Sequence, residues 1–294
     1  MKALVLGGGG SKGAYQVGVL KRWLLEEKRD YDVVCGVSVG ALNSAALSQA
    51  PLGAPEKAYE YLDGIWNRVE NRKVRKWWFG WYLAALWKSS VYNSAPLEKW
   101  VKSELNMTKI RDSGRAVRIG VVSWNTGDYC LATENSERLA DWVLASASFP
   151  AFLNPIKLDG EEWTDGGVRN VAPLGAAIRA GATEIDVVLC SNPDLPRTWD
   201  PKKKNALSRA LRAVDLMGDE IIRGDLREAG LKNDLAVLGA KYKSVKIRVQ
   251  QPNCVLIEDS LDFSPSKVRE MRRKGYEDAC VSFYDPDPAG NQRP

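Results

Sequence analysis

The chain opens with KALVLGGGGSKG (Lys2–Gly13), a short apolar run that ends in four consecutive glycines. An apolar run of this length, bounded by glycine, is typical of a buried parallel strand. Apolar residues then recur at helical spacing over 14–27. A second buried strand is expected at 32–37 and a small-residue helix at 41–50. The order strand, glycine loop, helix, strand, turn, helix predicts an α/β fold around a mostly parallel central sheet.

The rest of the chain continues this pattern after one exceptional segment. Residues 51–110 hold six of the 11 tryptophans, and we expect an inserted, mainly helical cap there. With no repeat and no low-complexity linker, we expect one domain over 1–284 and a disordered tail at 285–294. The patterns predict strands at 117–124, 129–133, 156–158, 162–164, 184–190 and 245–249, and helices at 139–147, 174–180, 204–229 and 265–283.

Composition excludes several kinds of chemistry. The 294 residues include no histidine, so no Ser-His-Asp triad, Cys-His pair or His-ligated zinc site can form. The five cysteines are far apart and form no CxxC, which favours reduced thiols, and we expect neither a metal nor a cofactor. The apolar run after Met1 is too short for a signal peptide or a membrane span, which favours a cytoplasmic location. The net charge of +5 permits an anionic partner, such as a phospholipid surface, without requiring one.

A GxSxG motif at Gly36–Gly40 follows the second predicted strand and opens the next helix. This is the context of a nucleophile elbow. The glycines allow a tight turn that leaves the Ser38 hydroxyl uncovered, beside the positive end of the helix. The alternative is an ordinary strand–helix turn in which Ser38 only caps the helix.

The glycine loop at Gly7–Gly13 has three possible functions. A P-loop requires Gly before its Lys and Ser or Thr after it, whereas the order here is Ser-Lys-Gly, so this function fails. A dinucleotide site needs an acidic residue at the end of the second strand, where Gly36–Ser38 stands instead. The third function is an oxyanion hole made of successive backbone N–H groups. Because the loop and the elbow follow adjacent parallel strands, both are expected at the same edge of the sheet.

The sequence Asp165-Gly166-Gly167 follows another short predicted strand. Alone, it is an ordinary turn. With an exposed serine and no histidine, however, a carboxylate within hydrogen-bond reach is the natural base for Ser38. An aspartate with its usual pKa is a weaker base than imidazole near neutral pH. We therefore expect an oxyanion hole and a dry site to carry much of the catalysis.

In this order, GGGGSKG, GVSVG and DGG resemble the motifs of the patatin-like phospholipases, lipid acyl hydrolases with a Ser/Asp dyad. The blocks GVSVGALNS, ASASFPAF and TDGGVRNVAPL are also similar to the family, and the resemblance covers residues 3–190. It implies a three-layer α/β/α fold in which Ser38 is the nucleophile and Asp165 the base. The resemblance places the oxyanion hole on the backbone of Gly8, Gly9 and Gly10, and the other motif glycines are Gly13, Gly36, Gly40, Gly166 and Gly167.

The resemblance further implies a phospholipid or other lipid ester as substrate, with peripheral contact to a membrane. Basic residues precede a run of tryptophans in 72–88, as in an interfacial helix, and Trp77, Trp78 and Trp81 are its candidate lipid contacts. A cap helix packed on the core is the alternative for this segment. A transacylase or a general carboxylesterase would use the same acyl-enzyme. From other classes, a catalytically silent membrane-binding module and a nucleotide-binding protein stay as alternatives. No nucleic-acid partner is expected, and the oligomeric state is not encoded in any motif.

Overall fold

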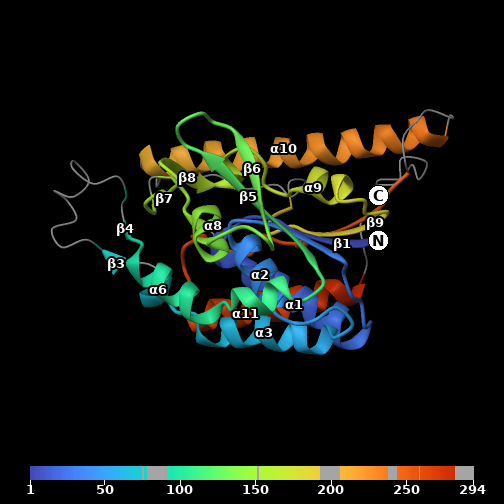
Figure 1. The fold of residues 1–294 in the computed structure, drawn as a ribbon, viewed down its shortest axis with the longest axis horizontal. Coiled ribbons are helices and arrows are strands. Elements are labelled where there is room, and N and C mark those ends of the chain that lie inside the picture. The colour runs from blue at the N-terminus through green and yellow to red at the C-terminus, as the bar shows by residue number, and fades with distance from the viewer. Residues whose placement is uncertain are drawn as a thin grey trace.

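The computed structural model describes residues 1–74, 76–77, 90, 92–150, 152–192, 206–237, 244–257 and 259–281. Its centre is a sheet in the order β10-β9-β1-β2-β5-β8-β7, with β6 paired to β5 beside this path (Figure 1). The strands of this sheet are β1 (Lys2–Leu6), β2 (Val33–Val37), β5 (Ala116–Ser123), β6 (Tyr129–Thr133), β7 (Ile156–Leu158), β8 (Glu161–Asp165), β9 (Glu184–Val188) and β10 (Lys246–Gln250). A separate two-stranded sheet pairs β3 (Lys76–Trp77) with β4 (Tyr92–Asn93).

The sheet is parallel from β10 to β5 and antiparallel beyond. β1 lies between β9 and β2, with Leu6 opposite Gly36 on one side and Val188 on the other. β6 and β8 run antiparallel to β5, and β7 runs antiparallel to β8. Because parallel strands share their carboxyl edge, the loops after β1, β2 and β9 emerge together, which is where ligands bind in open α/β sheets.

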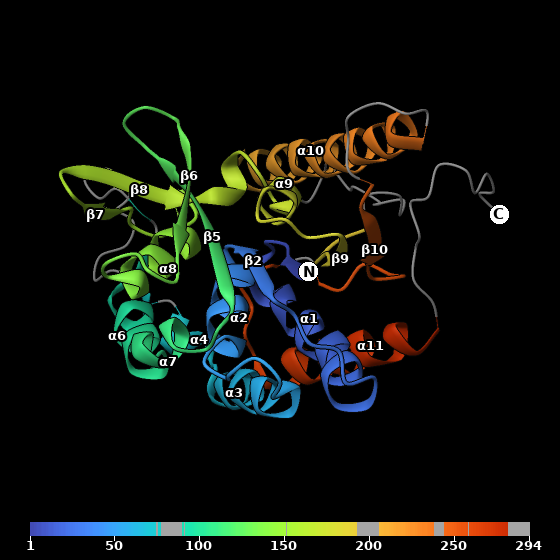
Figure 2. The same ribbon diagram turned by 45° about the vertical axis from the view of Figure 1, so that its right-hand side comes forward.

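Helices cover both faces of the sheet, as Figures 1 and 2 show. One face carries α9 (Leu174–Arg179) and α10 (Ala206–Val237). The other face carries α1 (Gly13–Leu20), α2 (Val39–Leu47), α3 (Pro55–Arg68) and α11 (Pro265–Val281). The shorter elements are η1 (Gly10–Lys12), η2 (Lys21–Glu26), α4 (Asn71–Val74), α6 (Ala95–Glu104), α7 (Met107–Arg111), α8 (Leu139–Ala147) and η3 (Gly166–Val168). Each face has its own apolar core, and the α1 side holds the larger one.

The α/β fold expected from the sequence is confirmed, with two differences in detail. The helix expected over 14–27 divides into α1 and a π-helical segment, η2, and α10 continues past its expected end to Val237. A helical cap over 51–110 is not confirmed, because α3 packs against α2 and η2 in the helical layer and the segment also contains the β3–β4 pair. The tail expected at 285–294 lies outside the described residues.

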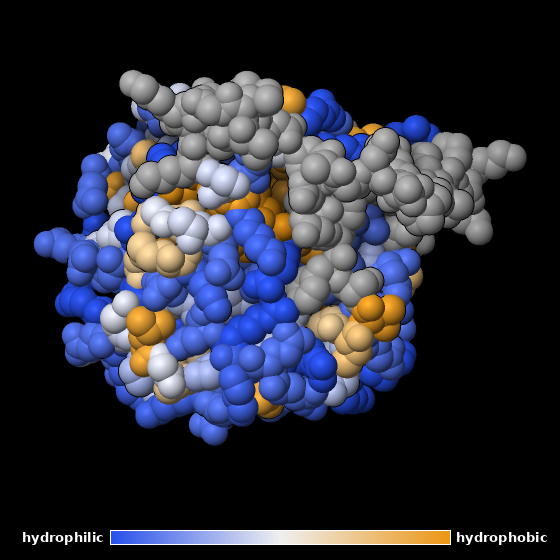
Figure 3. All heavy atoms as spheres, turned by 90° about the vertical axis from the view of Figure 1, so that its right-hand side faces the viewer, coloured by the Kyte–Doolittle hydropathy of each residue, from blue (hydrophilic) through white to orange (hydrophobic). Residues whose placement is uncertain are grey.

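The surface on the side of the N-terminus is mainly hydrophilic. Figure 3 shows blue, hydrophilic residues over most of its described part, with apolar residues gathered in patches. In the described part of the chain, no helix is both long enough and apolar enough to cross a membrane.

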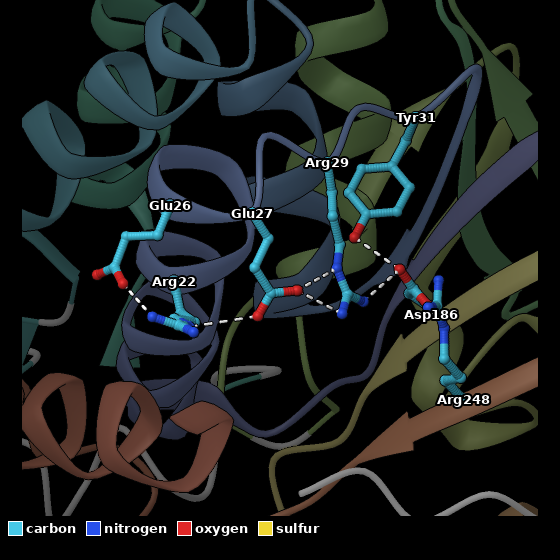
Figure 4. Close-up of polar contacts among 7 residues, drawn as sticks. All are labelled: Arg22, Glu26, Glu27, Arg29, Tyr31, Asp186 and Arg248. Carbon is cyan, nitrogen blue, oxygen red and sulfur yellow. Dashed lines mark hydrogen bonds and ion pairs between the residues drawn. The ribbon is translucent and has the colours of Figure 1, made fainter. Parts of the chain in front are cut away.

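One buried carboxylate ties three segments together at β9. Asp186 accepts hydrogen bonds from Arg29 Nη1 at 2.9 Å, Tyr31 Oη at 2.9 Å and Arg248 Nε at 2.7 Å (Figure 4). Burial, with the neighbouring Asp186 carboxylate, raises the pKa of Tyr31 well above its usual value, so the phenol stays protonated and donates. A buried charge is tolerated only when it is paired, and here β10 and the chain segment before β2 supply the partners. The cluster therefore holds β9, β10 and the segment before β2 together.

Helix α11 is anchored to α1 by two facing glycines. A Cβ on Gly18 would lie 2.0 Å from the carbonyl oxygen of Arg272, and a Cβ on Gly275 would lie 2.1 Å from the carbonyl oxygen of Tyr15. The two backbones are thus in direct contact, with no room for a side chain between them. Asp278 of α11 also accepts a hydrogen bond from the Tyr15 hydroxyl at 3.2 Å. Helix α1 directly follows the glycine loop, so α11 packs against the element that positions this loop.

Replacing Gly275 by alanine should therefore destabilise the protein by about 1–3 kcal/mol, because the methyl group forces the two helices apart. Urea unfolding followed by circular dichroism measures this change. Gly224→Ala in α10 is the matched control, since among the described residues no atom other than the helix's own backbone lies within 4 Å of its Cβ position. Alanine there should raise stability by up to about 1 kcal/mol through helix propensity. Equal effects of the two substitutions would contradict the close backbone contact.

Candidate active site

Ser38 occupies a sharp turn between β2 and α2. Its backbone angles are φ 58° and ψ −127°, a conformation that costs a non-glycine residue free energy and that clusters at functional sites. A Cβ on Gly36 would lie 2.2 Å from the carbonyl oxygen of Gly40, and a Cβ on Gly40 would lie 2.1 Å from that of Leu6. The GxSxG spacing is thus a packing requirement of this turn. The Ser38 side chain makes no capping hydrogen bond to α2, so the structure does not favour the helix-cap alternative.

Asp165 ends β8 and lies at the same place. β8 pairs with β5 so that Asp165 stands opposite Val121. Its carboxylate accepts a hydrogen bond from the Gly167 N–H at 2.8 Å and lines the same cavity as Ser38. The structure therefore brings together two side chains that are far apart in the sequence.

The environment of Asp165 makes it a stronger base than its residue type suggests. Its exposed fraction is 1%. Burial raises the pKa of Asp165 from the usual 3.8 to about 7, while the neighbouring Ser38 side chain and the hydrogen bond from Gly167 oppose this rise. Burial disfavours the charged form of a carboxyl group, and these two groups only partly offset that cost. This differs from the sequence expectation of a weak base, because the burial of Asp165 depends on tertiary packing.

The glycine loop passes directly over Ser38. A Cβ on Gly8 would lie 3.2 Å from the Cβ of Ser38. The Gly8 N–H donates to the carbonyl of Val171 at 2.9 Å, so it is already occupied. Gly9 and Gly10 have φ angles of 154° and 59°, and in the described part of the chain their N–H groups have no acceptor. Of the three glycines expected to form the oxyanion hole, the second and third therefore offer the open donors.

Two polar side chains that were not predicted from the sequence, Gln16 and Asn43, support the glycine loop through hydrogen bonds. Gln16 donates to the carbonyl of Gly7 at 2.8 Å, and Asn43 donates to Gln16 Oε1 at 2.8 Å. Trp66 Nε1 donates in turn to Asn43 Oδ1 at 2.7 Å. All three are buried, so the network is shielded from water and holds the loop in one conformation. The available signal was polar residues at buried helical positions, as in the GALNS block that contains Asn43.

A cavity of about 540 Å³ opens onto Ser38, Asp165 and the glycine loop. Its walls are mostly apolar, and distant parts of the chain supply them: Trp66, Leu97, Phe149, Phe152, Ile222 and Phe263. Ile222 belongs to α10, and Phe263, which precedes α11, stacks on Trp66 with ring centroids 6.2 Å apart. The region after residue 190, which the motifs left without a role, thus forms part of the cavity. Lys12 and Arg212 are the basic residues among its described lining, and Asp219 and Asp259 are also there.

The candidate lipid contacts are not placed by the structure. Trp78 and Trp81 lie outside the described residues, and only the backbone of Trp77 is described, in β3. Among the described residues, no group of three or more cysteine or acidic side chains is arranged to hold a metal ion.

The geometry of the motifs agrees with a comparison of the sequence with known families. A family model described as patatin-like phospholipase matches residues 4–178. The chain belongs to the patatin-like phospholipase family. The matched residues include both Ser38 and Asp165.

Three relatives carry the similarity at low sequence identity. The chain is 27% identical over 190 residues to the patatin-like phospholipase domain-containing protein ZK370.4 of Caenorhabditis elegans, covering 61% of this chain and 13% of that protein. It is 25% identical over 195 residues to the uncharacterized protein YjjU of Escherichia coli, covering 63% and 51%. It is 25% identical over 228 residues to the neuropathy target esterase sws of Drosophila melanogaster, covering 72% and 15%. The chain thus spans about half of the bacterial relative and a small part of the other two.

Among solved structures, VipD from Legionella pneumophila is similar, with a TM-score of 0.43 and 13% sequence identity. The similarity covers 97% of this chain and 68% of VipD.

Proposed function

We propose that this patatin-like phospholipase cleaves carboxylic esters of lipids through an acyl-enzyme on Ser38, with Asp165 as the base. The observation that carries the proposal is that the Ser38 side chain and the buried Asp165 carboxyl line the same apolar cavity beside the glycine loop. A serine needs an adjacent base to become a nucleophile, and the Asp165 carboxyl is close enough to the Ser38 side chain for that side chain to lower its pKa.

The proposed reaction has two halves. Ser38 Oγ attacks the ester carbonyl carbon while Asp165 accepts its proton, and the N–H groups of Gly9 and Gly10 stabilise the resulting oxyanion. The tetrahedral intermediate expels the alcohol, which takes the proton from Asp165, and the acyl group stays on Ser38. Asp165 then takes a proton from a water molecule that attacks the acyl-enzyme, and the proton returns to Ser38 as the fatty acid leaves. In comparable enzymes, one lost oxyanion donor costs roughly 3–4 kcal/mol of transition-state stabilisation.

The cavity supports a lipid rather than a small polar ester as substrate. Its apolar walls suit an acyl chain. Lys12 and Arg212 can pair with the phosphate of a phospholipid or lysophospholipid in the same cavity. Contact with a membrane surface belongs to this proposal, since such substrates reside in bilayers and micelles. A transacylase or general carboxylesterase shares the acyl-enzyme, and product analysis with a competing alcohol acceptor separates these possibilities.

A fluorophosphonate probe tests the proposed nucleophile. It should label the wild-type protein at Ser38, because the probe reacts with serines that an adjacent base activates. Mass spectrometry of the labelled peptide identifies the site. A protein that resists labelling, or that is labelled at another serine, would support the alternative of a catalytically silent membrane-binding module.

The apolar cavity also predicts a dependence on acyl-chain length. For nitrophenyl esters from butyrate to octanoate, kept below their critical micelle concentrations, kcat/KM should rise up to about fourfold per added methylene. This factor corresponds to about 0.8 kcal/mol for each buried CH₂ group. Steady-state kinetics on the ester series measures it. A flat or falling series would contradict an acyl chain bound along these walls.

A further inference from the structure

The carboxyl end of α8 contacts both members of the proposed dyad. Ser146, with an exposed fraction of 0%, accepts a hydrogen bond from the backbone N–H of Ser38 at 3.0 Å. Its own hydroxyl proton is donated to the carbonyl of Gly120 in β5 at 2.7 Å. Two residues later, the carbonyl of Ser148 accepts from the backbone N–H of Asp165 at 3.2 Å. It also accepts from the Thr164 hydroxyl at 2.6 Å. One short segment thus holds the nucleophile on one side and the base on the other.

The hydrogen bonds of Ser146 have a fixed direction. A serine hydroxyl has a single proton, and here Gly120 receives it. The lone pairs of the Ser146 oxygen are therefore free to accept the hydrogen bond from the Ser38 N–H. No residue of the elbow, Gly36–Gly40, accepts this hydrogen bond. Gly120 precedes Val121, the residue paired with Asp165. The hydroxyl therefore connects the strained turn of Ser38 to the strand that carries the partner of Asp165.

We infer that Ser146 is a positioning residue, which keeps the Ser38 turn at the distance from Asp165 that proton transfer requires. This inference rests on the proposed function. Ser146 does not touch the reacting atoms and acts through the backbone of Ser38. A turn with φ 58° needs surrounding contacts to persist, and the Ser146 hydroxyl contacts its N–H directly. Without this oxygen, Ser38 would still be present, but its Oγ would no longer be held toward the carboxylate.

The chain supplies a matched control two residues away. Ser148 is also buried, and its hydroxyl donates to the carbonyl of Leu144 within the same helix. Ser146→Ala and Ser148→Ala therefore each delete one buried oxygen from the same segment, but only the first deletes a contact to Ser38. The contacts of Ser148 to Asp165 and Thr164 use its backbone carbonyl, so they survive the substitution.

The test compares ester hydrolysis, fluorophosphonate labelling and thermal unfolding in these two variants. Ser146→Ala should lower kcat and the labelling rate by about 10- to 100-fold, the effect of a small misplacement of a reacting group. Its KM should stay within about twofold of the wild type. Ser148→Ala should keep all three kinetic values within about twofold. If Ser146 had a purely structural role, Ser146→Ala would lower the unfolding temperature but would not lower kcat while leaving KM unchanged.

Three results would overturn the inference. Ser146→Ala could match Ser148→Ala in labelling rate, or its activity could return fully when the assay is cooled below its unfolding transition. Where the alanine variant does not fold, Ser146→Cys replaces the oxygen by a weakly hydrogen-bonding sulfur, and wild-type rates in that variant would also overturn it. The proposed function has a separate test. It requires Ser38→Ala to be inactive, whatever the activity of Ser146→Ala.

Discussion

Ser38→Ala should abolish ester hydrolysis, with a fall in kcat on the order of 10⁴-fold or more. The substitution removes the oxygen that forms the acyl-enzyme, and no other step of the proposed reaction can replace it. In serine hydrolases, loss of the nucleophile removes most of the rate enhancement and leaves only what binding and the oxyanion hole supply. Steady-state hydrolysis of a nitrophenyl ester, together with release of fatty acid from a lysophospholipid, measures the effect.

Ser44→Ala is the matched control for this substitution. Ser44 lies on α2, which Ser38 precedes, and its hydroxyl is buried without a hydrogen-bond partner in the described part of the chain. Its removal should leave hydrolysis within about twofold of the wild type and should not weaken folding. Both variants should show cooperative unfolding. Full activity in Ser38→Ala, or equal losses in the two variants, would end the assignment of Ser38 as nucleophile.

The sequence allowed the elbow and the dyad motifs to be predicted because their constraints are local. Gly36 and Gly40 flank Ser38 at positions where a Cβ would overlap the backbone. Strand β1 and the glycine loop are likewise adjacent in the chain, and parallel pairing brings β1 beside β2. Short-range spacing therefore carried enough information to place the glycine loop next to Ser38.

The walls of the cavity and the open oxyanion donors could not be predicted in this way. Phe263 and Ile222 reach the site only through the packing of α10 and α11, which no motif describes. The carbonyl of Val171 accepts the hydrogen bond of the Gly8 N–H, so this N–H cannot donate to an oxyanion. Val171 lies more than 150 residues away in the sequence, and this contact could not be foreseen from the glycine motif. The carbonyl of Ser260 accepts from the Ser11 N–H at 2.7 Å and holds the far end of the loop. Such contacts are tertiary, so the sequence pattern alone does not show them.

Asp165→Asn should lower kcat by roughly 10³- to 10⁴-fold, the range seen when an essential carboxylate of a serine hydrolase becomes an amide. The amide keeps the size of the side chain and can still accept from the Gly167 N–H, but it cannot take the Ser38 proton.

Wild-type kcat/KM should rise with pH and reach half of its plateau near pH 7, because burial raises the pKa of Asp165 to about 7 and only the ionised form is a base. The chain has no histidine that could produce such a midpoint. A pH–rate profile of both proteins measures this, and a variant that keeps the same midpoint would contradict the assignment.

The same raised pKa should make Asp165 oppose folding at the pH at which it supports catalysis. In the unfolded chain the carboxyl group ionises near pH 3.8, whereas in the folded protein it stays neutral up to about pH 7. The neutral carboxyl makes its full contribution to the free energy of unfolding below pH 3.8. This contribution declines as the pH rises and is lost above pH 7. Three pKa units correspond to about 4 kcal/mol, so Asp165→Asn should unfold at higher urea concentration than the wild type at pH 8. This advantage should shrink towards pH 4, where the wild-type carboxyl is also neutral. A difference between the two proteins that does not change with pH would show that the Asp165 carboxyl is not neutralised by burial, and the aspartate would then lack the basicity that the proposed mechanism requires.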